Sequence, residues 1–304
     1  MKTDKAESTS QVSLLGAWIL SIRPRTLPAS IAPVIVGTAA AAFDNRFVAL
    51  PALAALIGAV LLQIGVNLAN DYFDHQRGID TAERLGPVRV TQSGLISPVR
   101  VKRAMMGTLA AAAAAGLYLS CIAGWPVLII GTASILAALA YSGGPYPLAS
   151  HGLGDLLVFI FFGPVAVCGT YYVQALRLTG QVAWLSLPIG LLITAIMVVN
   201  NLRDIPTDAK SGKKTLAVIL GVRQTRLEYI FLMAGAYGMP VVLFLTADLA
   251  GWILLPLLSV PLAIPVLQSV RCGEGSQLNN ALARTAALSL LYSLLFSAGL
   301  LLSA

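Results

Sequence analysis

Two short stretches rich in aspartate and asparagine interrupt an otherwise apolar chain, and the first is Asn67-Leu68-Ala69-Asn70-Asp71-Tyr72-Phe73-Asp74. The second follows a later apolar run and is Asn200-Asn201-Leu202-Arg203-Asp204-Ile205-Pro206-Thr207-Asp208. The whole chain has only 13 acidic side chains, so two such groups at the ends of apolar runs are unusual. Carboxylates are costly to place at a membrane boundary. The usual reason to keep them there is a bound cation, or a polyanion bound through cations.

The composition is that of a membrane protein that crosses the bilayer several times. Hydrophobic residues make up 57% of the 304 residues and charged residues make up 11%, whereas a soluble domain has about 25% charged residues. The three cysteines form no CxxC pair and there are two histidines, which argues against disulfides and against a Cys or His metal site. The basic residues are spread over many segments, so the net charge of +7 predicts no nucleic-acid partner.

The apolar runs predict an all-α fold. A helix needs about 20 apolar residues to cross a bilayer, and we predict nine such transmembrane helices in one bundle. Residues 1–13 form a polar tail in this prediction, and residues 14–304 form a single transmembrane domain. The predicted spans are residues 17–42, 48–69, 101–122, 125–142, 155–176, 181–200, 226–246, 249–269 and 282–302.

The distribution of Lys and Arg predicts how these spans are oriented. With the N-terminus in the cytoplasm, 18 of the 20 basic residues fall on the cytoplasmic side, and only Arg46 and Arg177 fall outside it. Cytoplasmic loops carry an excess of Lys and Arg, so we predict a cytoplasmic N-terminus and a C-terminus on the opposite side. The two acidic stretches follow spans two and six. Both are therefore predicted at the cytoplasmic face, where they can form one site.

The spacing of polar residues in the first stretch places several of them on one face of a helix. Asp71 and Asp74 are three residues apart and are predicted to share a face. Gln63, Asn67 and Asn70 continue the stripe back into the span. A polar stripe is thus predicted to run from inside the membrane to its edge.

The second stretch has a similar spacing with a proline inside it. Asp204 and Asp208 are four residues apart and would align on a helix. Pro206 lies between them and is able either to end the helix or to begin a new turn, so the spacing alone leaves their alignment open. Asn-Leu pairs precede the aspartates in both stretches, which suggests a weak internal repeat of a kind also found in transporters.

These side chains have the chemistry of a Mg²⁺ and phosphate site. Mg²⁺ prefers oxygen ligands and usually takes one or two carboxylates together with phosphate oxygens of a substrate. Two facing carboxylate groups therefore predict a diphosphate bound through Mg²⁺. The candidate metal ligands are Asp71, Asp74, Asp80, Asp204 and Asp208. The candidates for binding the diphosphate itself are Asn67, Asn70, Arg77, Arg84, Arg89, Lys213 and Lys214.

With these residues the chain resembles the UbiA superfamily of intramembrane prenyltransferases. The first stretch is similar to its NDxxDxxxD motif but has Gly78 at the last position, with Asp80 two residues later. The second stretch is similar to its DxxxD motif at Asp204 and Asp208. The shifted Asp80 resembles the branch that prenylates 1,4-dihydroxy-2-naphthoate in menaquinone biosynthesis. Other segments that carry this resemblance are Arg23-Pro24-Arg25-Thr26-Leu27, Arg84-Leu85-Gly86-Pro87, Gly152-Leu153-Gly154-Asp155 and Gly212-Lys213-Lys214-Thr215-Leu216.

The resemblance implies a reaction, a cofactor and partners. A polyprenyl group would pass from its diphosphate to 1,4-dihydroxy-2-naphthoate in a bacterial inner membrane, with loss of CO₂ and diphosphate and with Mg²⁺ as cofactor. Catalytic roles are implied for Asp74, Arg77, Tyr141 and Asp208. No obligate protein partner is expected. The length of the tail, and whether it is polyprenyl or phytyl, stays open because hydrophobic linings look alike in sequence.

Aromatic and basic residues outside the two stretches are further candidates. Tyr141 and Tyr146 belong to the segment that ends span four. They could shield an allylic cation by a cation–π contact, or could be interfacial anchors. Arg23, Arg25 and His151 are candidates for binding an acidic aromatic substrate. Positive-inside anchoring explains the two arginines equally well.

Two other functions remain as alternatives at this point. One is a prenyltransferase for another aromatic acid, such as 4-hydroxybenzoate. The other is an ion-coupled secondary transporter, in which carboxylates should lie near the bilayer midplane at broken helices. The carboxylates of this chain are predicted at span ends beside many cations, which favours phosphate chemistry.

Overall fold

The computed structural model describes residues 12–79, 85–86, 88–247 and 249–304. Within these ranges every regular element is a helix, and there is no strand. Two residues of the predicted site, Asp80 and Arg84, lie outside the described residues, as do residues 1–11 of the predicted tail.

Nine described segments are long and apolar enough to cross a membrane, which confirms the number of spans predicted from the sequence. Five of them are single helices: α4 (Ala49–Gln76), α5 (Pro98–Ala123), α6 (Trp125–Ser142), α9 (Gly180–Lys210) and α11 (Val222–Thr246). The ninth consists of a short 3₁₀ turn followed by α13 (Leu278–Leu302). The first span combines α2 (Leu14–Ile22) with α3 (Leu27–Phe43), and the fifth combines α7 (Gly154–Ile160) with α8 (Ala166–Ala175). The eighth ends in α12 (Val260–Cys272), and the short α10 (Leu216–Leu220) precedes α11.

The first span, predicted at residues 17–42, is broken at Arg23 into two helices. Arg23 has a left-handed backbone with a φ of 55°, and Pro24 begins a short 3₁₀ turn that leads into α3. The carbonyl of Ile22, at the end of α2, accepts a hydrogen bond of 2.8 Å from the Asn67 amide on α4. This hydrogen bond connects the break in the first span to the first acidic stretch.

The second acidic stretch is helical in spite of its proline. α9 runs to Lys210 with Pro206 inside it, ten residues beyond the predicted end at residue 200. A proline removes one backbone hydrogen bond and crowds the preceding turn, but Pro206 lies only one turn from the end of this helix. Asp204 and Asp208 therefore lie on adjacent turns of one helix.

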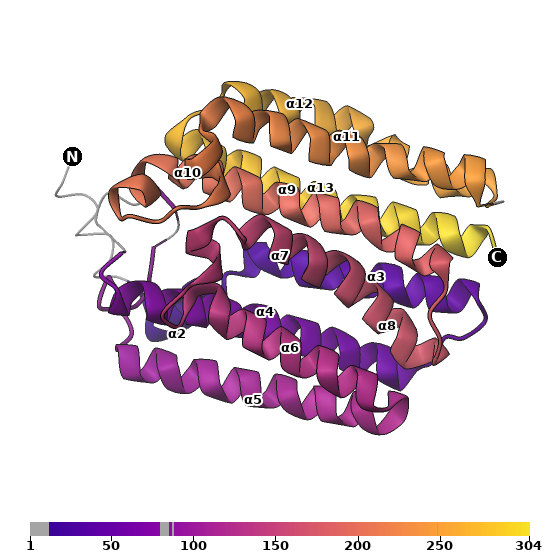
Figure 1. Cartoon of the computed structure of the whole chain (residues 1–304), viewed down its shortest axis with the longest axis horizontal. Coiled ribbons are helices and arrows are strands. Elements are labelled where there is room, and N and C mark those ends of the chain that lie inside the picture. The colour runs from indigo at the N-terminus through magenta and orange to yellow at the C-terminus, as the bar shows by residue number, and fades with distance from the viewer. Residues whose placement is uncertain (1–11, 80–84, 87, 248) are drawn as a thin grey trace.

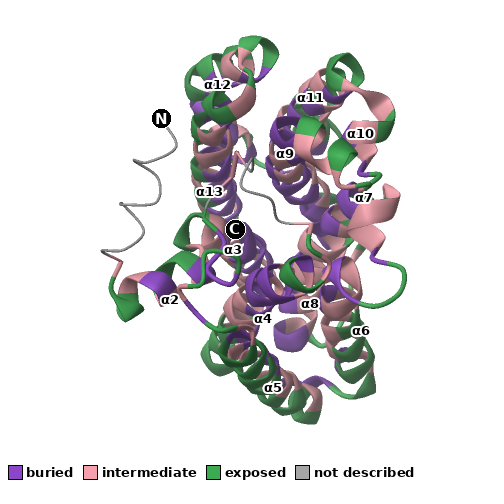
Figure 2. Ribbon diagram, turned by 90° about the vertical axis from the view of Figure 1, so that its left-hand side faces the viewer, coloured by how far each residue is buried: buried purple, intermediate pink, exposed green. Residues whose placement is uncertain are grey.

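The helices lie side by side along one direction, with α10 at one end of the bundle and the C-terminus at the other (Figure 1). Seen from the side, α5 and α6 form one edge of the bundle and α11 and α12 the opposite edge, with α3, α4, α9 and α13 between them (Figure 2). The largest apolar core is formed by buried residues of α3, α8, α9, α11 and α13. The two edge layers thus surround a central layer that carries both acidic stretches.

Several glycines allow helices of the core to approach closely. A Cβ added to Gly37 on α3 would lie 2.5 Å from the carbonyl oxygen of Val167, and one added to Gly163 would lie 2.9 Å from the Cα of Gly190 on α9. Small residues at helix contacts are typical of membrane proteins, where close packing replaces the hydrophobic effect as the force between helices. These contacts fix α3, α8 and α9 relative to one another.

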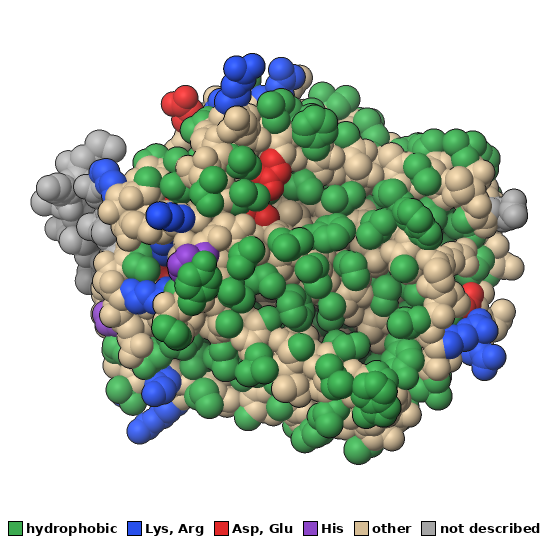
Figure 3. All heavy atoms as spheres, in the orientation of Figure 1, with side chains coloured by type: hydrophobic (Ala, Val, Ile, Leu, Met, Phe, Trp, Pro, Cys, Tyr) green, Lys and Arg blue, Asp and Glu red, His purple; other side chains and the backbone are tan. Residues whose placement is uncertain are grey.

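The outer surface is apolar along the middle of the bundle and charged toward its ends (Figure 3). Large apolar side chains there are strongly exposed, including Leu15, Trp125, Phe231 and Leu245. A soluble protein rarely exposes such a continuous apolar surface. The surface is that of a multi-pass membrane protein whose spans face lipid.

We expect the close contact at Gly37 to be needed for stability. Gly37→Ala forces its new methyl group against the Val167 carbonyl, and overpacking of this kind costs about 1–3 kcal/mol. The variant should show a lower apparent melting temperature in detergent. Gly238→Ala on α11 is the matched control, because a Cβ there would meet nothing within 4 Å. Equal melting temperatures for the two variants would contradict the packing described above.

Candidate active site

One cavity of about 960 Å³ receives side chains from both acidic stretches. From α4 it is lined by Asn67, Asn70 and Asp74, and from α9 by Asn200, Asn201, Arg203, Asp204 and Asp208. The structure therefore brings together the two stretches that the sequence predicted to form one site. The same cavity continues from this polar end into an apolar part lined by α4, α5, α6 and α8.

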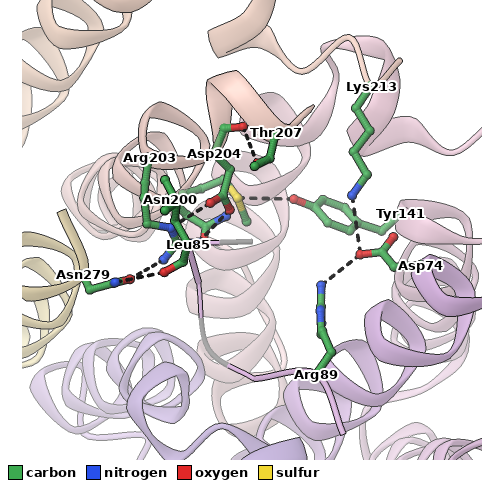
Figure 4. A network of polar contacts seen from close by, with 11 residues as sticks. Asp74, Leu85, Arg89, Tyr141, Asn200, Arg203, Asp204, Thr207, Lys213 and Asn279 are labelled. Carbon is green, nitrogen blue, oxygen red and sulfur yellow. Dashed lines mark hydrogen bonds and ion pairs between the residues drawn. The ribbon is translucent and has the colours of Figure 1, made fainter. Parts of the chain in front are cut away.

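Asp74 is the centre of a buried ion-pair group that joins the two stretches. Its Oδ2 lies 2.9 Å from Nη2 of Arg89 and 3.4 Å from Nζ of Lys213 (Figure 4). Arg89 follows the first stretch and Lys213 follows the second, and all three side chains line the cavity. Two cations thus lie beside one carboxylate at the polar end, where they could also pair with the oxygens of a phosphate.

Asp71 is directed elsewhere, although the sequence grouped it with Asp74 as a candidate metal ligand. Its two carboxylate oxygens accept hydrogen bonds from the backbone N–H groups of Val90 and Thr91, at 3.2 and 3.3 Å. Asp71 is not among the residues that line the cavity. Residues three apart on a helix differ by about 60° in direction, which is enough to place Asp74 on the cavity and Asp71 on the neighbouring segment. In this arrangement Asp71 positions the segment that carries Arg89.

The second stretch contains its own ion pair, which the sequence analysis did not identify. Arg203 donates through Nε and Nη2 to the two oxygens of Asp204, at 2.8 and 2.6 Å. Arg203 also donates to the side chains of Asn200 and, on α13, Asn279 (Figure 4). The signal in the sequence was an arginine directly before Asp204. Its partner on α13 lies 76 residues away and could not be read from spacing.

Amide and arginine side chains near the end of α4 bond to neighbouring backbone and side-chain groups. Asn70 accepts a hydrogen bond from the hydroxyl of Ser142, and Arg77 donates to the carbonyl oxygens of Ser142 and Gly144. Burial lowers the pKa of the Arg77 guanidinium from its usual value, and the Asp74 carboxylate opposes that shift. Asn70 lines the cavity and Arg77 does not, so Arg77 holds the end of α6 against α4.

The candidates for an aromatic substrate fall into two groups. Arg23, Arg25 and Tyr141 line the cavity, and Figure 4 shows Tyr141 between the Asp204 and Asp74 groups. Tyr146 and His151 do not line it; they stack on each other with ring centroids 3.5 Å apart.

Two other polar residues have structural contacts close to the cavity. Lys214 does not line it, and its backbone N–H donates to the carbonyl of Ser150. Asn201, which the sequence analysis did not select, lines the cavity and donates to the buried carboxylate of Asp155 at 3.3 Å. Asn201 is therefore held in place by a second helix.

The carboxylates at this end of the cavity are of the kind that could hold Mg²⁺ together with the phosphate oxygens of a substrate. Among the described residues no three His, Cys, Asp or Glu side chains gather into a metal cluster. Asp74 on α4 and Asp204 and Asp208 on α9 line one cavity from different helices. One or two carboxylates per ion, completed by phosphate oxygens and water, is the usual arrangement for Mg²⁺.

We expect the Asp71 contacts to hold the segment around Val90 in place. Asp71→Ala removes both acceptors and leaves two backbone N–H groups without their partners, so this segment should open more often. Hydrogen exchange of residues 88–96 should become faster than in the parent protein. Asp44→Ala, at an ion pair with Arg177 far from the cavity, is the control. Unchanged exchange of residues 88–96 in Asp71→Ala would show that Asp71 does not anchor them.

Comparison with known proteins places the chain among enzymes with this architecture. The model of the "UbiA prenyltransferase family" matches residues 30–301. A relative named 1,4-dihydroxy-2-naphthoate octaprenyltransferase from Mycobacterium tuberculosis is 45% identical over 86% of this chain and 88% of its own. One of the same name from Escherichia coli is 40% identical over 96% of this chain and 97% of its own.

Solved structures share the fold at lower identity. An apo UbiA homologue from Aeropyrum pernix superimposes with a TM-score of 0.69 at 17% identity, covering 92% of this chain and 98% of its own. A UbiA homologue from Archaeoglobus fulgidus bound to GPP and Mg²⁺ gives a TM-score of 0.65 at 16% identity, covering 92% and 99%. The chain, with its two acidic stretches in one intramembrane cavity, belongs to the UbiA prenyltransferase family.

Proposed function

We propose that this protein transfers a polyprenyl group from its diphosphate to 1,4-dihydroxy-2-naphthoate, releasing diphosphate and CO₂ and forming a demethylmenaquinol. The observation that carries the proposal is one cavity with a charged end, formed by both acidic stretches, and a long apolar remainder. A prenyl diphosphate has the same division into a charged head and an apolar tail. The names of the relatives support the naphthoate as acceptor. Membership of a prenyltransferase family disfavours the transporter alternative.

Both the acidic and the basic side chains at the charged end of the cavity suit a diphosphate. Asp74, Asp204 and Asp208 would hold Mg²⁺, which supplies positive charge that stabilises the departing diphosphate. Arg89 and Lys213 already lie against Asp74 and would pair with phosphate oxygens. Asp80 and Arg84 remain candidates for the same roles. The GPP and Mg²⁺ bound by the Archaeoglobus fulgidus homologue support this assignment.

The cavity wall beyond the charged end offers groups for the two reacting carbons. As the C–O bond to diphosphate lengthens, the allylic carbon becomes cationic, and the ring of Tyr141 would stabilise it by a cation–π contact. Arg23 and Arg25 would pair with the naphthoate carboxylate. The ring carbon that bears this carboxylate forms the new C–C bond. The C–CO₂ bond then breaks, and its electron pair restores the aromatic ring.

The position of the charged end of the cavity also fits the membrane orientation predicted from the distribution of Lys and Arg. We place the polar end of the cavity at the cytoplasmic face of a bacterial inner membrane, where the water-soluble naphthoate could reach it. The apolar tail of the donor would stay among the spans.

The choice of substrates is tested directly with purified protein. With Mg²⁺ and a series of prenyl diphosphates, we expect product from 1,4-dihydroxy-2-naphthoate, identified by mass as the decarboxylated prenyl adduct. Little product should form from 4-hydroxybenzoate. Chelation of Mg²⁺ by EDTA should stop the reaction, and added Mg²⁺ should restore it. Preferential prenylation of 4-hydroxybenzoate would overturn the proposed acceptor.

Replacing a carboxylate by its amide should reduce activity whether the carboxylate lies on α4 or on α9. Asp74→Asn and Asp208→Asn keep the side-chain size but lose a charged ligand, and we expect each to reduce kcat/KM by about 100-fold or more. Membrane insertion should be normal. Asp44→Asn, which changes a carboxylate at the opposite end of the bundle, should retain activity. Near-normal turnover by Asp208→Asn would remove the second stretch from the proposed metal site.

A further inference from the structure

The segment Gly152-Leu153-Gly154-Asp155 places a buried carboxylate beside the cavity, and the proposed reaction does not use it. Asp155 lies in the first turn of α7 and is 5% exposed. The N–H groups in the first turn of a helix stabilise a carboxylate. The neighbouring Gly154 lies against Tyr141, since a Cβ added there would be 3.3 Å from the Tyr141 hydroxyl. Asp155 does not line the cavity, so it can act there only through a side chain that it contacts.

That side chain is the Asn201 amide on α9, and the contact fixes which way the amide is turned. Its Nδ2 lies 3.3 and 3.5 Å from the two carboxylate oxygens of Asp155. A carboxylate accepts hydrogen bonds and donates none, so the NH₂ group of the amide must face Asp155. The amide oxygen, Oδ1, therefore faces away from α7.

The Oδ1 of Asn201 is open to the cavity. The side chain of Asn201 lines the cavity. Within the part of the chain that the structure describes, Oδ1 has no hydrogen-bond partner, yet it is not one of the fully buried side-chain atoms that lack one. The cavity thus receives an amide oxygen, which is a hydrogen-bond acceptor and not a donor.

Asn201 lies deeper in the cavity than the carboxylates proposed to hold Mg²⁺. Asp204 and Asp208 follow it by three and seven residues, which is about 4.5 and 10 Å along the helix axis toward the charged end. Met197 lies one turn before Asn201 on the same face, and its Sδ is 3.4 Å from the hydroxyl of Tyr141. Asn201 is therefore closer to the level of Tyr141, where the proposed reaction forms the new C–C bond.

We propose that Asp155 positions Asn201 so that its Oδ1 accepts a hydrogen bond from a hydroxyl group of the aromatic acceptor. The inference rests on the proposed function, in which the hydroxyl-bearing ring attacks the allylic carbon beside Tyr141. As the C–C bond forms, the hydroxyl next to the attacked carbon shares the developing positive charge and becomes a stronger donor. The hydrogen bond to Asn201 then strengthens in the transition state, which raises kcat. Asp155 is a positioning residue, and Asn201 touches the substrate.

Two variants of Asp155 test whether it positions the amide. Asp155→Leu removes the acceptor and lets the Asn201 amide turn, so kcat with 1,4-dihydroxy-2-naphthoate should fall about tenfold or more, the usual effect of losing a hydrogen bond to a charged group. Asp155→Asn keeps an oxygen that accepts from Asn201 and should retain most of the activity. Thr285→Val is the matched control. It also removes a buried hydrogen bond, here between α11 and α13, but Thr285 does not line the cavity, so kcat should be unchanged.

Calorimetry with geranyl diphosphate and Mg²⁺ separates the acceptor from the charged end. Because Asp155 and Asn201 serve the acceptor, Asp155→Leu should bind this donor as tightly as the parent protein does. A loss of donor affinity that matches the loss of kcat would assign Asn201 to the Mg²⁺ or diphosphate site and would overturn the proposal. An unchanged kcat in Asp155→Leu would overturn it as well.

The hydroxyl group is tested with an acceptor that cannot donate. The parent protein should bind 1,4-dihydroxy-2-naphthoate more tightly than its 1,4-dimethoxy analogue, and Asp155→Leu should lose much of this preference. The same preference in both proteins would contradict the hydrogen bond to the hydroxyl.

Reversing the pair tests the orientation of the amide even if Asp155→Leu does not fold. Asn201→Asp places two carboxylates against each other and should lower kcat strongly. Adding Asp155→Asn to that variant restores one NH₂ donor and one carboxylate acceptor, with an oxygen still facing the cavity, so kcat should recover about tenfold or more. No recovery would overturn the proposal while leaving the proposed reaction intact. If the parent protein forms no product from the naphthoate, the proposed function itself fails.

Discussion

The buried carboxylate of Asp74 has a cation on either side of it, and the site depends on this contact. Arg89 and Lys213 come from segments that follow different spans, so their pairing with Asp74 draws the two acidic stretches to one cavity. A buried carboxylate without partners would be strongly unfavourable. In the proposed function the same two cations also pair with the oxygens of a diphosphate, so the group that stabilises the fold would also bind the substrate. Asp71, one turn away, supports the group by anchoring the segment that carries Arg89.

The apolar part of the cavity has a different role from its charged end. A hydrocarbon tail gains little by moving from lipid into an apolar cavity, so affinity must come from the charged head. The apolar part of the cavity then needs only to guide the tail and keep its allylic carbon beside Tyr141. Tail length and head recognition are in this way separated along one cavity.

Much of the fold and of the site could be predicted from the sequence, because hydropathy and charge distribution are properties of whole segments. The nine spans, and the presence of Asp74 and Asp208 at one cavity, follow from counting crossings. The break at Arg23, the direction of Asp71 and the bidentate contact of Arg203 with Asp204 do not, because they depend on single backbone angles and side-chain rotamers. The helical course through Pro206 was open for the same reason.

In the proposed function both acidic stretches bind one Mg²⁺–diphosphate group. The most direct measurement is a double-mutant cycle in which calorimetry follows the binding of geranyl diphosphate and Mg²⁺ to the parent protein, Asp74→Asn, Asp208→Asn and the double variant. Groups that share one ligand should show a coupling energy of about 0.5–3 kcal/mol. Strictly additive losses, as expected of independent sites, would contradict the account.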